Sequence, residues 1–367
     1  MKGWRFWLPL GAGVVVVVAA IVVAIVLLAG GGGKTQETTQ TTQAQGEEQP
    51  VAPIPGSPDS GEQLPVTDKV WPVTLLLSVP LDVKTQANQP SDLVPVDGAM
   101  YVVDTLGGRL LKLSADGKTS TVFNAQTDPA LTLGGPFAIT SFQGQLYVAD
   151  SNDKRIVVVT TSGKVVRTIP LAKAAATDAK DPLPAGIAVW SDGSFAISDS
   201  NNQRLTKYDA NGSVLWTVGA GKRASGENGF STPLGVALDK DGNVYVVDLL
   251  NAKVKKYTAD GKFVSQFGDF AAAAGSLVRP YGVALDDQGN VYVSDGLQAA
   301  VQVFDQKGAF LGFIGRKDQT DPKSESLFAT PYGIKIVDGK LYVVDRFNGV
   351  FVFSLQATPS GSATPTS

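Results

Sequence analysis

The sequence predicts an all-β fold, a six-bladed β-propeller in which each blade is a four-stranded antiparallel sheet. The stretch 233–268 alternates four short β-prone runs with tight turns, two of which contain the Asp and Gly that hairpin turns favour. The stretch 280–315 repeats it nearly residue for residue, and the prolines at 136, 184, 233, 280 and 331 are 48, 49, 47 and 51 residues apart. Such a period with four strands per repeat is typical of propeller blades. The predicted blades cover residues 91–123, 136–169, 184–219, 233–268, 280–315 and 331–355.

The N-terminal segment predicts a transmembrane helix that anchors the protein. Residues 7–30 carry no charged side chain and are long enough to span a bilayer as a helix. A cleaved signal peptide is the alternative, but the apolar region of a signal peptide is usually shorter. Because Lys2 and Arg5 precede the helix, we expect residues 1–6 in the cytoplasm and the propeller of this single-pass protein outside it, at the cell membrane.

The segments that flank the repeats are rich in Thr, Gln, Gly, Pro and Ser, which predicts a disordered linker over 31–66 and a disordered tail over 357–367. Between them the propeller domain covers 67–356. The last repeat lacks a fourth strand, whereas the strand-like segment 70–79 belongs to no complete repeat. We expect residues 70–79 to close the ring as the outer strand of the sixth blade, since an unpaired edge strand invites aggregation.

The composition excludes several kinds of chemistry. The chain of 367 residues contains no cysteine and no histidine, so it has no disulfides, no Ser-His-Asp or Cys-His catalytic group and no histidine ligand for zinc. Its net charge of −3 and its expected place outside the cytoplasm argue against a nucleic-acid partner.

An acidic residue ends the second strand of every predicted blade. These acids form either a ring of metal or substrate ligands or a structural feature of the repeat, in which each carboxylate binds backbone amides and the basic residue five positions later. We favour the structural interpretation because a ligand site usually breaks the symmetry of a repeat. The six residues are Asp104, Asp150, Asp199, Asp248, Asp295 and Asp345.

The repeat motif resembles that of a known family. It reads Pro-x-Gly-(Ile/Val)-Ala, then Gly-Asn-Val-Tyr-Val-(Ala/Val)-Asp, then Asn-x-(Arg/Lys), and 199–205 matches its last part closely. This pattern, over roughly residues 90–355, resembles the NHL repeat of six-bladed propellers, and with an anchor and a linker it looks like the extracytoplasmic NHL sensor domains of bacterial membrane proteins. The resemblance weakens at Ala300 and Val350, which replace the basic residue.

Candidate ligand-binding residues lie where the chain enters the first strand of each blade, near long loops between blades. Aromatic or apolar side chains follow the repeat proline there, and two further candidates interrupt the repeat after the last of the six acids. The aromatic rings either stack on a ligand or pack as part of the core. The candidate residues are Phe137, Leu234, Tyr281, Tyr332, Arg346 and Phe347.

The resemblance implies a binding or scaffold module without catalysis and without a cofactor, whose partner outside the cytoplasm is a protein, a peptide or a glycan. An amidating lyase with related architecture works through zinc held by histidines, which this chain lacks. Related six-bladed lactonase-type enzymes use a central calcium ion bound by Asp, Asn and Glu. A calcium-dependent lactonase-like or lyase-like enzyme is therefore the alternative.

Overall fold

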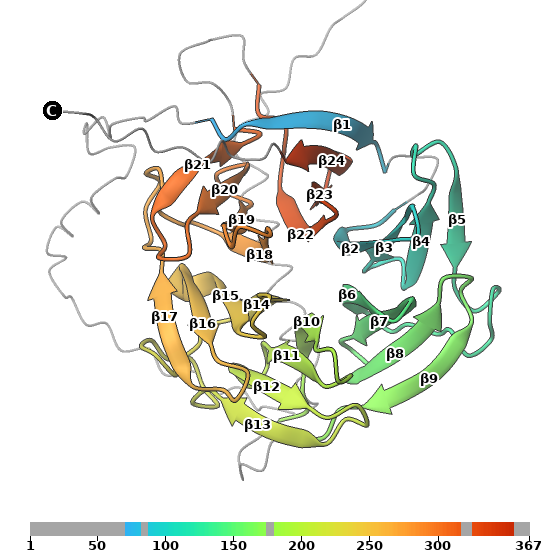
Figure 1. Cartoon of the computed structure of the whole chain (residues 1–367). Helices are drawn as coiled ribbons and strands as arrows, with labels where there is room; N and C mark the ends of the chain where they lie inside the picture. The colour runs from blue at the N-terminus through green and yellow to red at the C-terminus, as the bar shows by residue number, and fades with distance from the viewer. Residues whose placement is uncertain (1–69, 82–86, 174–179, 317–324, 356–367) are drawn as a thin grey trace, which may run out of the picture. The chain divides into compact units, whose positions relative to one another are not determined.

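Six four-stranded antiparallel sheets surround a central channel in the computed structural model, as predicted (Figure 1). The structure describes residues 70–81, 87–173, 180–316 and 325–355. The predicted anchor, linker and tail lie outside these described residues. Among the described residues, no helix is long and apolar enough to cross a membrane.

The blades are numbered 1 to 6 along the chain. Blade 1 contains β2 (Pro90–Val96), β3 (Ala99–Asp104), β4 (Arg109–Leu113) and β5 (Ser120–Phe123). Blade 2 contains β6 (Pro136–Phe142), β7 (Gln145–Asp150), β8 (Arg155–Thr160) and β9 (Val165–Pro170). Blade 3 contains β10 (Pro184–Val189), β11 (Phe195–Asp199), β12 (Arg204–Tyr208) and β13 (Val214–Val218). Blade 4 contains β14 (Pro233–Leu238), β15 (Val244–Asp248), the 3₁₀ turn η1 (Leu249–Asn251), β16 (Lys253–Tyr257) and β17 (Phe263–Phe267). Blade 5 contains β18 (Pro280–Leu285), β19 (Val291–Asp295), β20 (Ala300–Phe304) and β21 (Phe310–Ile314).

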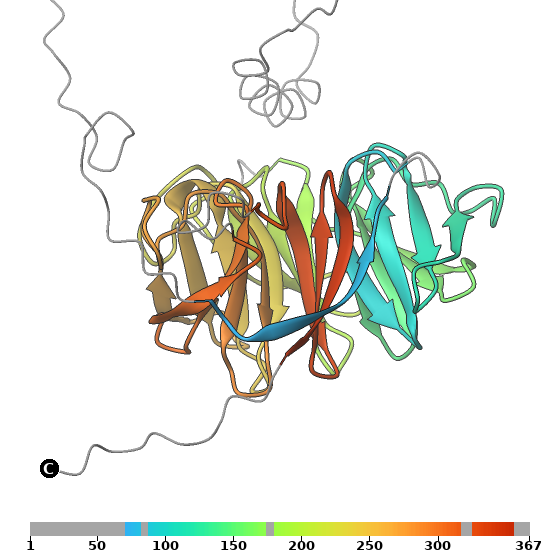
Figure 2. The ribbon, with the colours of Figure 1, turned by 90° about the horizontal axis from the view of Figure 1, so that it is seen from above.

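Blade 6 joins the two ends of the described chain. Its strands are β22 (Pro331–Val337), β23 (Lys340–Asp345), β24 (Gly349–Leu355) and, outermost, β1 (Val73–Val79). Figure 2 shows β1 along the outer side of this sheet, the place expected for the segment 70–79.

The first two residues of that segment pair with a different blade. Val70 forms a parallel bridge with Phe313 of β21, and the Trp71 indole donates a hydrogen bond to the Tyr292 hydroxyl at 3.1 Å. The segment before β1 therefore fastens blade 5 to blade 6.

The core lies between neighbouring blades. The second strands are buried along almost their whole length because sheets pack on both of their faces. Each gap between blades holds its own apolar cluster. Loops between consecutive blades send buried apolar side chains into these gaps, namely Leu131, Leu133, Leu171, Phe230, Leu277 and Phe328.

The antiparallel order gives the ring two different faces. We call the face with the loops between second and third strands, and between one blade and the next, the loop face. The opposite hairpin face carries the tight turns that join first to second and third to fourth strands. Because Val73 pairs with Leu355, β1 begins and β24 ends at the hairpin face.

Candidate functional site

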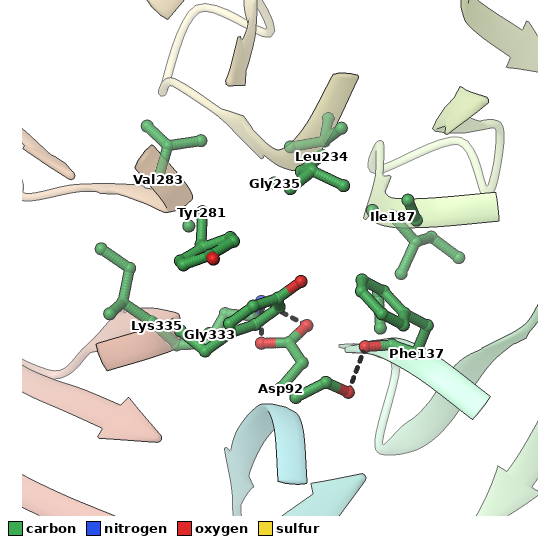
Figure 3. A pocket seen from close by; sticks show the side chains of 17 residues that line it. Asp92, Phe137, Ile187, Leu234, Gly235, Tyr281, Val283, Gly333 and Lys335 are labelled. Atoms are coloured by element: carbon green, nitrogen blue, oxygen red, sulfur yellow. Dashed lines mark hydrogen bonds and ion pairs between the residues drawn. The ribbon is translucent and has the colours of Figure 1, made fainter. Parts of the chain in front are cut away.

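The central channel is narrow and is lined by the first strand of every blade (Figure 3). Its cavity volume is ≈ 30 Å³, which holds about two water molecules. The glycines of the repeat explain the tight fit, because a Cβ atom on Gly186 would lie 2.3 Å from the carbonyl oxygen of Leu234, and one on Gly235 would lie 2.6 Å from that of Tyr281. Neighbouring first strands thus approach backbone to backbone, and little space remains at the axis.

One ion pair breaks the symmetry of the channel. Lys335 on β22 places its ammonium 2.9 Å from both carboxylate oxygens of Asp92 on β2 (Figure 3). The same carboxylate accepts backbone hydrogen bonds from Leu93 at 2.9 Å and from Ile139 of β6 at 3.0 Å. Burial raises the pKa of Asp92, and the ammonium of Lys335 opposes that shift. A single carboxylate therefore links the inner strands of blades 6, 1 and 2.

Neither residue of this pair is among the candidates predicted from the sequence, although the repeat contains a signal for it. Asp92 stands two residues after the repeat proline, where blades 3 to 6 have glycine, and Lys335 stands where blades 3 to 5 have alanine. A charged residue at a position that other blades fill with glycine or alanine is costly to bury unless it has a partner. Two such departures therefore indicated a pair.

Four of the predicted ligand-binding residues come together in one cluster. Leu234, Tyr281 and Tyr332 are only 6–8% exposed, and the half-buried Phe137 packs beside them. The Tyr281 and Tyr332 rings stack with centroids 4.1 Å apart, and Phe137 meets Tyr332 edge-on at 5.8 Å. Burial raises the pKa of the Tyr332 hydroxyl. The geometry fits rings that pack on one another.

The other two candidates differ from this cluster and from each other. The Arg346 guanidinium lies 4.3 Å from the centre of the Tyr332 ring and is half-buried. Phe347 is 65% exposed. Arg346 therefore lies beside the cluster, whereas Phe347 projects from the loop face.

Replacing Tyr332 by leucine is expected to lower the free energy of unfolding by about 1–2 kcal/mol, because the stacked and edge-on ring contacts are lost. Thermal melting measures the effect, with Phe347→Leu as an exposed control that should melt like the wild type. If both variants melt like the wild type, the rings are not packed in solution and stacking on a ligand becomes the better interpretation.

The six acids point away from the channel and hold loops together. Asp345 accepts hydrogen bonds from the backbone of Ala329 and Thr330, which precede its blade, and of Phe347 and Asn348 in the next turn. The other five carboxylates likewise accept a backbone hydrogen bond from the loop before their blade. None of the six lines the described channel. This geometry is what the structural interpretation expects.

The expected pairing with a base five positions later holds in two blades and is wrong for Asp248. The Nε atom of Arg109 lies 2.8 Å from Asp104, and that of Arg155 lies 3.0 Å from Asp150. Lysine has no donor at the Nε position, and Lys253 extends past the acid to Asp269.

Asp248 is paired instead with a buried lysine seven positions later. The Lys255 ammonium lies 2.9 Å from its carboxylate and donates to the carbonyl of Gly226 at 2.8 Å and to that of Gly229. Lys255 is 1% exposed. Its ammonium therefore holds the loop between blades 3 and 4 in place through two carbonyl groups of that loop.

The donor set of the channel does not fit a calcium ion. Calcium takes about six to eight oxygen ligands, usually with several carboxylates. Asp92 is the one carboxylate among the channel-lining residues of the described chain, and Lys335 already binds both of its oxygens. Within the described ranges, no group of three or more His, Cys, Asp or Glu side chains is placed to hold a metal.

Comparisons with solved structures agree with the fold. A streptogramin B lyase shares 15% identity over 78% of this chain and 100% of its own, with a TM-score of 0.54. A catalytically inactive histidine-to-alanine variant of virginiamycin B lyase from Staphylococcus aureus, with quinupristin, shares 14% over 80% and 98%, with a TM-score of 0.54. A luciferin-regenerating enzyme shares 13% over 76% and 94%, with a TM-score of 0.53. At these identities the likeness concerns the fold alone.

A search of curated protein sequences found no match. The family model that matches covers residues 93–315 and describes an SMP-30/gluconolactonase/LRE-like region, in place of the NHL repeat that the motifs resemble. The matched region is more than half of the chain and contains all strands from β3 to β21. The chain therefore belongs to the SMP-30/gluconolactonase/LRE-like family.

Proposed function

We propose that this propeller is a non-catalytic binding or scaffold module for a protein, a peptide or a glycan, held outside the cytoplasm by its N-terminal anchor. The narrow channel is the observation that carries the proposal. Its carboxylate is bound on both oxygens by Lys335, and its cavity holds only about two water molecules. Among the residues that the structure describes, the channel offers a substrate neither space nor an unpaired acid or base, so the loop face is the better binding surface.

The chain also lacks a residue on which a similar enzyme depends. The virginiamycin B lyase variant in which a histidine is replaced by alanine is catalytically inactive. This chain has no histidine at any position, so a reaction that needs an imidazole cannot be carried over to it.

A calcium-dependent lactonase-like or lyase-like enzyme is the second candidate, and membership of the SMP-30/gluconolactonase/LRE-like family favours it. The channel residues argue against it, because Asp92 would have to exchange the ammonium of Lys335 for the metal, and the described channel lining contains no second carboxylate. We therefore derive no catalytic step through a metal ion.

Elemental analysis and a thermal melt of the full chain, purified in mild detergent, test these candidates. We expect no stoichiometric metal and the same melting temperature with and without EDTA, since no described cluster of side chains would lose a ligand. A bound calcium ion whose removal lowers the melting temperature, together with turnover in a screen of lactones and esters, would establish the enzyme instead.

A further inference from the structure

One position on the loop face carries exposed apolar side chains in four consecutive blades. It lies two residues after the acid that ends each second strand. In blades 4, 5, 6 and 1, which are neighbours in the ring (Figure 1), this position is filled by Leu250, Leu297, Phe347 and Leu106. These side chains are 52%, 66%, 65% and 52% exposed, and we call them the apolar arc.

The fold does not require apolar residues there. Blades 2 and 3 have Asn152 and Asn201 at the same position and form the same turn. The side chain at this position does not hold the turn. Instead, its backbone amide donates to the preceding acid: the Asp295 carboxylate accepts from Leu297 at 3.2 Å, and the Asp345 carboxylate accepts from Phe347 at 3.0 Å. Single exposed apolar residues need no explanation, but here the same position is filled by an exposed apolar side chain in four neighbouring blades, and this repeated choice points to an interaction surface.

An arginine that has no acidic partner in the described part of the chain lies next to the arc. Arg346 directly precedes Phe347, and its guanidinium rests against the Tyr332 ring. Its Nε atom is buried without a hydrogen-bond partner, and it forms no ion pair within the described ranges. The guanidinium is thus fixed in place by the ring while part of its hydrogen-bonding capacity remains unused.

A second arginine lies beside Leu297. The carbonyl oxygen of Arg279 accepts the amide hydrogen bond of Gly296, the residue before Leu297. Among the described residues Arg279 has no ion pair either, in contrast to Arg155, which binds Asp150 at 3.0 Å. The backbone of a second arginine that has no ion pair within the described ranges therefore lies next to the arc.

We propose that the apolar arc and Arg346 dock a polypeptide segment that presents an acidic side chain flanked by apolar residues. This inference rests on the proposed binding function and names the surface and the partner. A carboxylate can form two parallel hydrogen bonds with a guanidinium, while leucine and phenylalanine side chains cover the flanking apolar groups.

A protruding side chain fits this surface better than a lipid bilayer does. Arg346 is half-buried, whereas Phe347 beside it is 65% exposed. A flat surface would meet the arc first and leave the guanidinium unpaired, but an acidic side chain can reach past Phe347 to the arginine.

Selection from a random linear-peptide display library with the full chain tests the proposal. We expect the enriched peptides to combine Asp or Glu with leucine or phenylalanine within a few positions. Leu297→Ser and Phe347→Ser should each weaken such a peptide by about tenfold. Leu215→Ser and Val166→Ser, which are 55% and 46% exposed on the outer strands β13 and β9, are matched controls that should bind like the wild type.

A double-mutant cycle then tests the acid directly. Changing the peptide's Glu to Gln should weaken binding to the wild type by about tenfold but have little further effect on Arg346→Gln. Peptides without acidic residues, or binding that the arc variants leave intact and the controls abolish, would overturn the docking site while leaving a binding function in place. If neither peptides nor a glycan array yields a ligand, both proposals are wrong. Arc-dependent binding to phosphatidylserine vesicles without peptide binding would assign the surface to a membrane instead.

Discussion

Lys255→Met is expected to lower the free energy of unfolding by about 3–5 kcal/mol, because it removes one partner of a fully buried ion pair. Methionine keeps most of the side-chain volume, so the loss reports on the charge and its hydrogen bonds. Asp248, which is 0% exposed, would keep the backbone amide of Ser231 and the Asn251 amide group but lose its counter-ion. The carbonyl oxygens of Gly226 and Gly229 would lose their donor as well. Urea denaturation of wild type and variant measures the difference.

A second substitution, Asp248→Asn, and the pH dependence of stability distinguish the effect of the lost charge from that of the lost loop contacts. Adding Asp248→Asn should recover much of the loss if the unpaired carboxylate causes it. Burial raises the pKa of Asp248, and loss of Lys255 should raise this pKa further. A raised pKa in the folded state means that the folded protein gains stability as the pH falls through that pKa, so the defect should be smaller at about pH 5 than at about pH 8. A pH-independent defect that Asp248→Asn does not repair would show that the loop carbonyls matter more than the charge.

Asp92→Ala is expected to lower the free energy of unfolding by about 3–5 kcal/mol, because the one carboxylate that it removes binds three different groups. The ammonium of Lys335 would remain in the channel without its counter-ion, and the amides of Leu93 and Ile139 would lose their acceptor. The affected contacts join the inner strands of three blades, including the junction of the first and last blades. Chemical denaturation gives the size of the effect.

Exchanging the two residues provides a sharp control. The variant Asp92→Lys/Lys335→Asp keeps both charges but moves the carboxylate to β22, away from the two amides on β2 and β6. We therefore expect little rescue by the exchange, whereas Asp92→Asn, which keeps one acceptor oxygen, should be milder than alanine. Full rescue by the exchange would mean that the charge pair alone stabilises the junction and that the backbone hydrogen bonds contribute little.

The sequence was most informative where the repeat is regular. The Asp-Gly turns and the spacing of the prolines are local signals, and they were enough to predict six blades and the sheet order within them. The incomplete last repeat pointed to β1 as the closing strand because strand edges need partners. The same regularity explains the six acids, which hold equivalent turns in every blade.

What the sequence did not reveal depends on contacts between distant residues. Asp92 and Lys335 are 243 positions apart, and only the closed ring brings them together. Lys255 lies on β16, the third strand of its blade, and its burial depends on the loop between blades 3 and 4, whose carbonyl groups it binds. The burial of Tyr281 and Tyr332 could not be read from their repeat position either, because it depends on how closely neighbouring first strands approach.

The closing strand has a consequence for how the protein is synthesised. β24 starts at Gly349, about 270 residues after β1 ends at Val79, so the first strand of the ring to be translated pairs with the last. At about 5–20 residues per second, β1 waits roughly 14–54 s on the ribosome before its partner exists. During that time a run of three leucines, Leu75 to Leu77, has no sheet to join. Ring closure thus cannot precede the synthesis of β24, and the nascent chain must keep β1 from pairing with other chains until then.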